Sequence, residues 1–250
     1  MSITCVFGTI GNAGMSFTDK INNNLIKMYN YTCKCNNVIG YVDFQKRISD
    51  NCDISESNVR MYSPFLYYHG FINEYRNGAA IKVSDFFTPL GKAYIKSLIL
   101  SLKIKTELPQ KKSQNITKDI LSLSMFNRKN NGQEDYYFDF LRFCFKYGKI
   151  CVKEFNYMIY EREIHKLENY IDDIADKIYQ FRNGEVDFNF LQDRTSKKGE
   201  QVREAFPDNT FNYTRNLLLE AGLIIELDNK EYKINPDKED VVRLLIKEDL

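Results

Sequence analysis

The chain has 250 residues, and its 35 lysines and arginines nearly balance its 34 aspartates and glutamates, so that the formal net charge is +1. With 43% hydrophobic and 28% charged residues, the composition excludes a disordered tail and a membrane protein. A neutral total also excludes the simplest electrostatic sign of nucleic-acid binding, which is a chain that is basic throughout. It leaves a locally basic face open.

The chain start and the hydrophobic runs predict a cytoplasmic protein without a membrane partner. Residues 1–8 lack the basic and apolar regions of a secretory signal, and no apolar run approaches the roughly 18–20 residues of a membrane span. The six cysteines are then expected to be reduced thiols. Cys33 and Cys35, with Cys52 and His69 downstream, suggest zinc, but their close spacing is unlike that of the usual zinc hairpin.

Residues 1–104 predict an N-terminal arm followed by a first helical subdomain. The glycines within 8–14 favour a flexible arm over a nucleotide-binding loop, because the lysine of a phosphate loop is missing. Apolar residues at helical spacing predict one helix over 16–28 and a second within 42–48.

A third helix and a hairpin are predicted next. The polar run 55–58 is suited to capping the helix, and Gly70 ends it because glycine accepts a left-handed conformation. Pro64 should kink or split this helix, since its ring clashes with the preceding turn. Strands over 71–75 and 80–83 are predicted to pair with each other through an Asn-Gly turn.

The polar run 105–116, which contains Pro109, predicts a linker between two subdomains. The second subdomain is then expected over 117–250. Its predicted helices, short strand and closing hairpin lie over 136–145, 150–152, 154–163, 164–181, 208–222 and 223–234.

Both halves contain a capped helix, then a glycine, then a two-stranded hairpin. Gly70-Phe71-Ile72 and Gly222-Leu223-Ile224 occupy the same place in the two halves. This order is typical of the winged helix, a helix-turn-helix variant with a hairpin beside its recognition helix. We therefore predict an α+β, mostly α fold with two winged-helix subdomains.

A winged helix presents the start of its third helix to the major groove, where asparagine suits adenine, arginine suits guanine and hydroxyls make single hydrogen bonds. Wing tips and basic loops contact phosphates. The same residue types at a helix start also act as ordinary caps. The predicted DNA-binding residues are Ser55, Ser57, Asn58, Arg60, Arg76, Lys197, Lys198, Asn209, Thr210, Asn212, Arg215 and Lys230.

Several short motifs follow one another in a recognisable order. They are Phe7-Gly8 with Gly11-Asn12, the run 58–83, Thr88-Pro89-Leu90-Gly91, and the runs 138–154 and 213–234. In this order the chain resembles the DNA-recognition part of FokI-like and AlwI-like type IIS restriction endonucleases. It departs from the AlwI-like arm at Ala13-Gly14, where that arm tends to have a proline and an arginine nearby.

The resemblance implies recognition of a short asymmetric duplex sequence and cleavage outside it. A separate nuclease domain or subunit with carboxylates, a lysine and Mg²⁺ would do the cutting. We expect no cofactor in this chain itself. Pro207-Asp208 and Glu231-Tyr232-Lys233 match a nuclease signature, but a helix start and a wing strand are unsuited to sharing a metal, so no catalytic residue is predicted.

The leading hypothesis is sequence-specific binding of double-stranded DNA. The chain would be the recognition portion or subunit of a type IIS-like restriction or nicking endonuclease, cytoplasmic and monomeric on DNA. One alternative is a winged-helix transcriptional regulator, and another is a winged-helix protein–protein adaptor. The recognised base sequence stays open.

Overall fold

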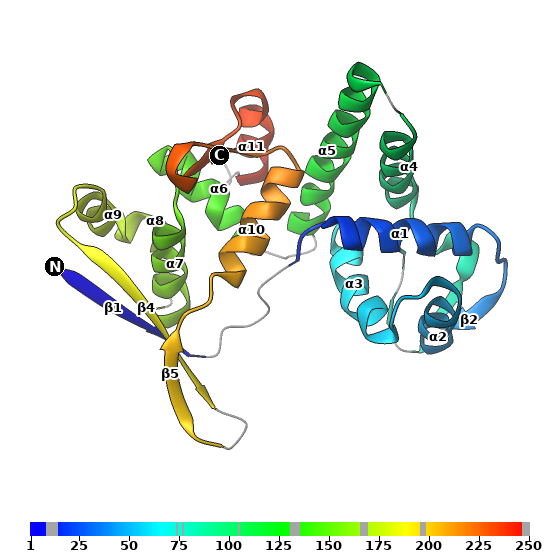
Figure 1. Ribbon diagram of the computed structural model, residues 1–250, viewed down its shortest axis with the longest axis horizontal. Coiled ribbons are helices and arrows are strands. Elements are labelled where there is room, and N and C mark those ends of the chain that lie inside the picture. Colours follow the sequence, from blue (N-terminus) through cyan, green and yellow to red (C-terminus); the bar gives the residue numbers. More distant parts are fainter. Residues whose placement is uncertain are drawn as a thin grey trace. The chain divides into compact units, whose positions relative to one another are not determined.

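The computed structural model describes residues 1–8, 15–73, 75–76, 78–104, 106–130, 136–165, 170–195 and 199–246. It is mostly helical, with short strands (Figure 1), which confirms the predicted α+β, mostly α class. No helix among these residues has the length and apolar character needed to cross a membrane.

The chain folds into two compact units. The helical unit consists of residues 17–134 and 220–222, and the mixed unit consists of 1–16, 135–219 and 223–250. This division differs from the predicted one, because the first residues belong with the second half of the chain.

The helical unit has five helices among its described residues, and two short strands. Each of three helices begins at a hydroxyl cap: Thr18, Ser55 and Thr88 accept hydrogen bonds from Ile21, Asn58 and Gly91 N–H, respectively. The elements are α1 (Asp19–Thr32), β2 (Val38–Gly40), α2 (Tyr41–Cys52), α3 (Glu56–Tyr68), β3 (Ala80–Lys82), the 3-10 turn η1 (Val83–Asp85), α4 (Pro89–Lys103) and α5 (Glu107–Asn130).

Aromatic rings fill the centre of this unit. The Phe17 ring lies 4.7 Å from Phe65 and 5.1 Å from Tyr94, and Tyr94 stacks on Phe71 at 4.9 Å, between ring centroids. The start of α4 crosses Phe71 so closely that a Cβ on Gly91 would lie 2.1 Å from the Phe71 carbonyl oxygen. Glycine at this position therefore permits the crossing.

The predicted split of the third helix at Pro64 and the predicted pairing of the first hairpin are wrong. Helix α3 runs through Pro64 without a break, because Tyr62, Phe65 and Leu66 bury its apolar face on both sides of the proline.

The strand over 80–82 pairs with 38–40, with Ile39 opposite Ile81, and not with 71–75. Ile72 instead forms a bridge with Phe87. The local Asn-Gly signal could not reveal this pairing with a distant segment, and Asn77 lies outside the described residues.

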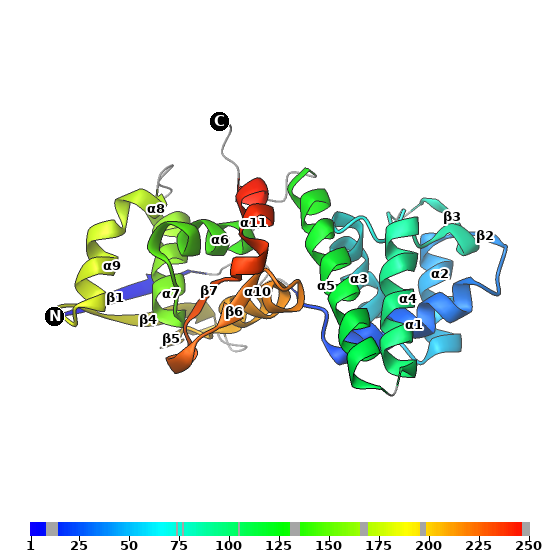
Figure 2. The same cartoon turned by 90° about the horizontal axis from the view of Figure 1, so that it is seen from above.

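The predicted linker 105–116 is helical from Glu107 onward, as the first half of α5. Pro109 lies in the first turn, where a helix needs no N–H from it. Figure 2 shows α4 and α5 side by side. Small hydroxyl side chains join them: Ser101 donates to Ser113 Oγ at 2.8 Å, and Thr117 donates to Ser97 Oγ at 2.8 Å.

The mixed unit combines helices with two small sheets. Its elements are β1 (Ser2–Phe7), α6 (Tyr136–Tyr147), α7 (Val152–Tyr160), the π-helical turn η2 (Glu161–His165), α8 (Tyr170–Asp173), α9 (Ala175–Arg182), β4 (Asp187–Thr195), β5 (Gln201–Ala205), α10 (Asn209–Glu220), β6 (Ile224–Glu226), η3 (Asp228–Lys230), β7 (Tyr232–Ile234), η4 (Pro236–Lys238) and α11 (Glu239–Ile246). The final residue of α10, Glu220, belongs to the helical unit.

The three-stranded sheet β1–β4–β5 is absent from the sequence-based prediction (Figure 1). Residues 2–7 were expected in an arm, but they pair in parallel with 187–192. Cys5 and Phe7 are fully buried, and Phe7 stacks on Phe206 with centroids 4.0 Å apart. The apolar burial of β1 thus prevents it from being a free arm.

The helix predicted over 164–181 is interrupted: the described residues form α8 and α9. The second hairpin is confirmed, with β6 antiparallel to β7 and Ile224 opposite Ile234. Its turn places Asn229 and Lys230 at φ of 62° and 59°.

Candidate nucleic-acid interface

In the helical unit, a three-residue turn joins α2 to α3. Asp53 has a left-handed conformation (φ 55°, ψ 48°), Ile54 is only 2% exposed, and Ser55 caps α3 by accepting a hydrogen bond from Asn58 N–H at 3.3 Å. A buried side chain and a capping hydroxyl therefore fix the direction in which α3 begins.

The predicted residues at this helix start differ in how they face solvent. Ser55 and Ser57 share a hydrogen bond between their hydroxyl oxygens at 3.0 Å, and both are exposed. Asn58 is half-buried, whereas Arg60 is exposed and makes no hydrogen bond or ion pair with the rest of the described chain. Arg76 is also exposed and follows α3 in the same unit.

In the mixed unit, the start of α10 presents Asn209, which is exposed, and Asn212, which is half-buried. The side chain of Thr210 is only 4% exposed, so it packs inside the unit. Lys230 is exposed at the hairpin turn. Lys197 and Lys198 lie outside the described residues.

Arg215 lies on the same helix, and its guanidinium is held by the hairpin. Its Nη1 donates to the Tyr232 hydroxyl at 3.1 Å, and the Tyr232 hydroxyl donates to Glu226 Oε1 at 3.0 Å. The guanidinium carbon also lies 5.6 Å from the centroid of the Phe211 ring. Sequence reasoning assigned Arg215 to base contact, but in this structure it joins α10 to β6 and β7.

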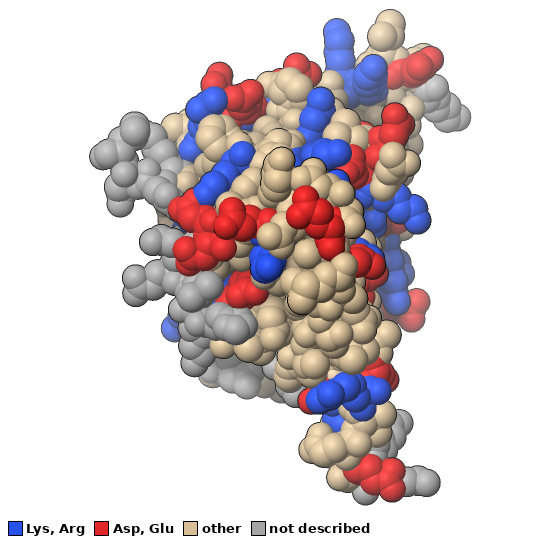
Figure 3. All heavy atoms as spheres, turned by 90° about the vertical axis from the view of Figure 1, so that its left-hand side faces the viewer, with Lys and Arg blue, Asp and Glu red and all other residues tan. Residues whose placement is uncertain are grey.

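Two arginines on the strands β4 and β5 are each balanced by an acidic residue. Arg194 pairs with Glu204 at 3.0 Å, and Arg203 makes two hydrogen bonds to Asp193 at 2.7 and 3.0 Å. Figure 3 shows basic and acidic side chains interspersed on the face that it presents. The positive charge of these two arginines is therefore neutralised locally.

Two further clusters, which sequence reasoning missed, hold α6 and α7 in place. Buried Glu154 accepts a hydrogen bond from Arg182 Nε at 2.6 Å, and the same guanidinium donates to the carbonyls of Tyr147 and Lys149. Buried Asp139 pairs with Arg142 and Arg162, and burial raises the pKa of the Asp139 carboxyl. These charges are structural because their partners lie on neighbouring elements of one unit.

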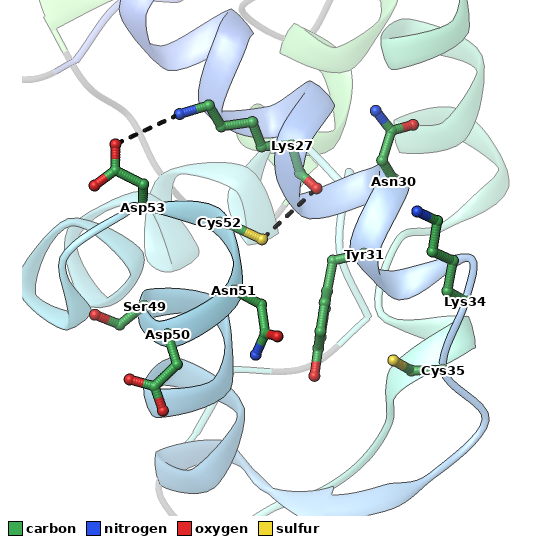
Figure 4. Close-up of a pocket in the computed structure, with 10 residues that line it drawn as sticks. All are labelled: Lys27, Asn30, Tyr31, Lys34, Cys35, Ser49, Asp50, Asn51, Cys52 and Asp53. Carbon is green, nitrogen blue, oxygen red and sulfur yellow. Dashed lines mark hydrogen bonds and ion pairs between the residues drawn. The ribbon is translucent and has the colours of Figure 1, made fainter.

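A hollow of about 810 Å³ lies between the C-terminal ends of α1 and α2 (Figure 4). Lys27 and Lys34 line it together with Asp50 and Asp53, and Lys27 Nζ lies 3.9 Å from Asp53 Oδ2. Helix C-terminal ends carry partial negative charge and disfavour phosphate. The hollow is therefore unsuited to the DNA backbone.

The cysteines that suggested zinc do not form a site with His69. Cys35 and Cys52 line this hollow, and Cys33 is exposed, whereas His69 is fully buried and its Nδ1 lies 2.8 Å from Ser124 Oγ. Across the described ranges, no three side chains of His, Cys, Asp or Glu are grouped so as to hold a metal ion.

The carboxylates of the nuclease signature have separate partners. Asp208 Oδ1 accepts a hydrogen bond from Asn156 at 3.1 Å, and Glu231 Oε2 pairs with Lys149 Nζ at 2.8 Å. Each carboxylate thus has its own structural role in the mixed unit.

No family model, curated protein or solved structure matches this chain.

Proposed function

We propose that the chain binds duplex DNA through two winged-helix subdomains, one in each unit. A single observation carries the proposal: in each unit, a segment between two helices pairs with a strand that follows a later helix, and that later helix ends at a glycine in the left-handed conformation. A repeated supersecondary plan favours two copies of one binding module.

The first part of the repeat is the pairing of strands. In the helical unit, the segment between α1 and α2 pairs with β3, where Ile39 lies opposite Ile81. In the mixed unit, Ile150 lies between α6 and α7 and exchanges two 2.9 Å hydrogen bonds with Tyr232 of β7. Residues 161–208 are then an insertion between the second and third helices of the motif.

The second part is the way in which the third helix ends. Gly70 and Gly222 have φ of 69° and 68°. The residue after each glycine donates its N–H to a carbonyl five positions earlier, Phe71 to Leu66 at 2.8 Å and Leu223 to Leu218 at 3.0 Å. Both helices therefore end in the same kind of cap.

The exposed polar residues fit this proposal. Ser57 and Arg60 would contact base edges or phosphates from α3, and Asn209 and Asn212 from α10. Lys230 at the hairpin turn is suited to a phosphate. Because the net charge of the chain is only +1, non-specific affinity stays low and base contacts supply more of the discrimination.

The sequence resemblance extends this proposal to the recognition portion or subunit of a type IIS-like restriction or nicking endonuclease. The chain would bind as a monomer, and Mg²⁺ would belong to an associated nuclease domain or subunit.

A binding selection from a random duplex library tests the proposal. We expect enrichment of one short non-palindromic sequence, bound by one copy of the chain, with an affinity that falls as salt rises. Enrichment of a palindrome by a dimer would support the transcriptional regulator instead. The absence of any enriched or salt-sensitive binding would contradict DNA binding and favour the protein–protein adaptor.

A further inference from the structure

The helical unit contains a second cavity, of about 670 Å³, which the DNA-binding proposal does not use. Its buried walls include the rings of Phe17 and Tyr94 and the side chain of Leu121, each no more than 2% exposed. Polar side chains from α1 and α5 line its exposed side, among them Asn23 and Lys118. The volume lies in the range typical of small-molecule sites.

Only one oxygen of the Glu220 carboxylate in this cavity accepts a hydrogen bond from a described residue. Glu220 Oε2 accepts a hydrogen bond from the Phe17 N–H at 2.6 Å. No described residue makes a hydrogen bond or an ion pair with Oε1. Burial, together with the nearby charge of Asp19, raises the pKa of Glu220 to about 7. An ionised carboxylate at this position therefore lacks a cation that would stabilise it.

The charged residues that line the cavity determine the charge of a ligand that would bind there. Asp19 and Glu220 are both acidic, and Lys118 is the basic residue of the lining. Lys118 is exposed and forms no ion pair with another described residue, so water weakens its field in the cavity but does not abolish it. An anion would meet two carboxylates, and a neutral ligand would leave Glu220 Oε1 without a charged partner.

We propose that this cavity binds a small organic cation with a flat apolar body and a protonated amine or amidinium group. The cationic group pairs with Glu220, and the apolar body packs against the walls formed by Phe17, Tyr94 and Leu121. The site is independent of the DNA contacts proposed for α3 and α10.

Three probes of nearly equal shape test the proposal on the full chain by calorimetry and amide NMR at pH 8, where Glu220 is ionised. They are the cation benzamidine, the neutral benzamide and the anion benzoate. Benzamidine should bind about tenfold more tightly than benzamide, benzoate should bind least, and the shifted amides should belong to α1, α4 and α5.

Two variants separate the site from general charge effects. Glu220→Gln keeps an acceptor for the Phe17 N–H but should reduce benzamidine affinity to the benzamide level. Glu107→Gln, at an exposed position of α5, should leave the affinity unchanged. Equal binding of benzamidine and benzamide, or equal loss in both variants, would overturn the proposal.

The substitution Lys118→Gln should change benzamidine affinity in the opposite direction from Glu220→Gln. It also provides a test if Glu220→Gln proves to be destabilised. Removing this cation from the cavity should strengthen benzamidine binding by about two- to fivefold. If Glu220→Gln is unfolded by circular dichroism, this variant decides the question, and unchanged or weaker binding would overturn the proposal.

Discussion

Helices α3 and α10 end in the same way, but the chain that follows each of them is held by different forces. In the helical unit, α5 packs directly against the helix exit: Asn127 donates to the His69 carbonyl at 3.2 Å, and a Cβ on Gly70 would lie 2.6 Å from Asn127 Nδ2. In the mixed unit, Arg215 and Tyr232 connect the helix to the hairpin through charge-assisted hydrogen bonds. Close packing therefore supports the exit of α3, and a polar network supports the hairpin that follows α10.

The largest expected effect tests the packing of the helical unit. Gly91→Ala places a Cβ against the Phe71 carbonyl and should lower the free energy of unfolding by about 3 kcal/mol or more, because backbone must move. Gly40→Ala is the control, since its Cβ meets no atom closer than 4.0 Å. Urea unfolding of both variants checks this, and equal midpoints would contradict the proposed close crossing.

The charged clamp of the mixed unit should give the next largest effect. Arg182→Ala leaves the buried Glu154 carboxylate without its guanidinium and should cost about 2–3 kcal/mol of unfolding free energy. Arg203→Ala removes an exposed pair instead and should have no measurable effect. Thermal unfolding followed by circular dichroism distinguishes them, and similar losses would show that burial does not govern these pairs.

Two titratable groups in the helical unit, His69 and Glu220, should have opposite effects on the free energy of unfolding as the pH falls. Burial, with help from Arg128, holds the pKa of His69 well below 6.5, so the folded state binds fewer protons and stability falls below about pH 6.5. Glu220 has a pKa raised to about 7 from 4.5, so the folded state binds more protons and stability rises as pH falls from 7 to 4.5.

Wild-type stability should therefore change little between pH 6.5 and 4.5. In Glu220→Gln only the His69 effect remains, and acidification should cost up to about 1.4 kcal/mol per pH unit. Urea unfolding at several pH values measures both slopes. Parallel slopes for the two proteins would contradict this balance.

The smallest expected effect distinguishes an arginine that contacts DNA at the surface, Arg60, from one that stabilises the fold, Arg215. Arg60→Ala should weaken binding to a selected duplex by about 1 kcal/mol and leave thermal stability unchanged. Arg215→Ala should lower the stability of the mixed unit as well, because it removes the Tyr232 contact. If Arg60→Ala lowers stability and Arg215→Ala does not, the assignment of these two roles is reversed.

Sequence patterns within a few residues correctly predicted the helix ends that are formed by interactions between neighbouring residues. Ser55, Gly70 and Gly222 marked helix ends because capping and left-handed φ depend on a few neighbouring residues. The parallel pairing of β1 with β4 escaped prediction because its partner lies far away in the sequence. The role of Arg215 escaped for the same reason, since Tyr232 reaches it only through the fold of the hairpin.

The cavity residues were equally hidden. No periodic pattern connects Glu220 with Phe17, and only the folded chain brings a half-buried carboxylate to that backbone N–H. Asp208 and Glu231 show the opposite case. They match a nuclease motif in the sequence, but in the fold each carboxylate has a different structural partner.

The pairing of Ser2 with Asp187 also has a consequence for the order of folding. During synthesis, β1 emerges before the segment 17–134 of the helical unit, and its partner strand β4 emerges only after that segment. The segment 17–134 should therefore fold during synthesis before β1 can pair with β4. Until then, Cys5 and Phe7 are not buried by that pairing. A ribosome paused before Asp187 would hold a folded helical unit beside an exposed, aggregation-prone strand.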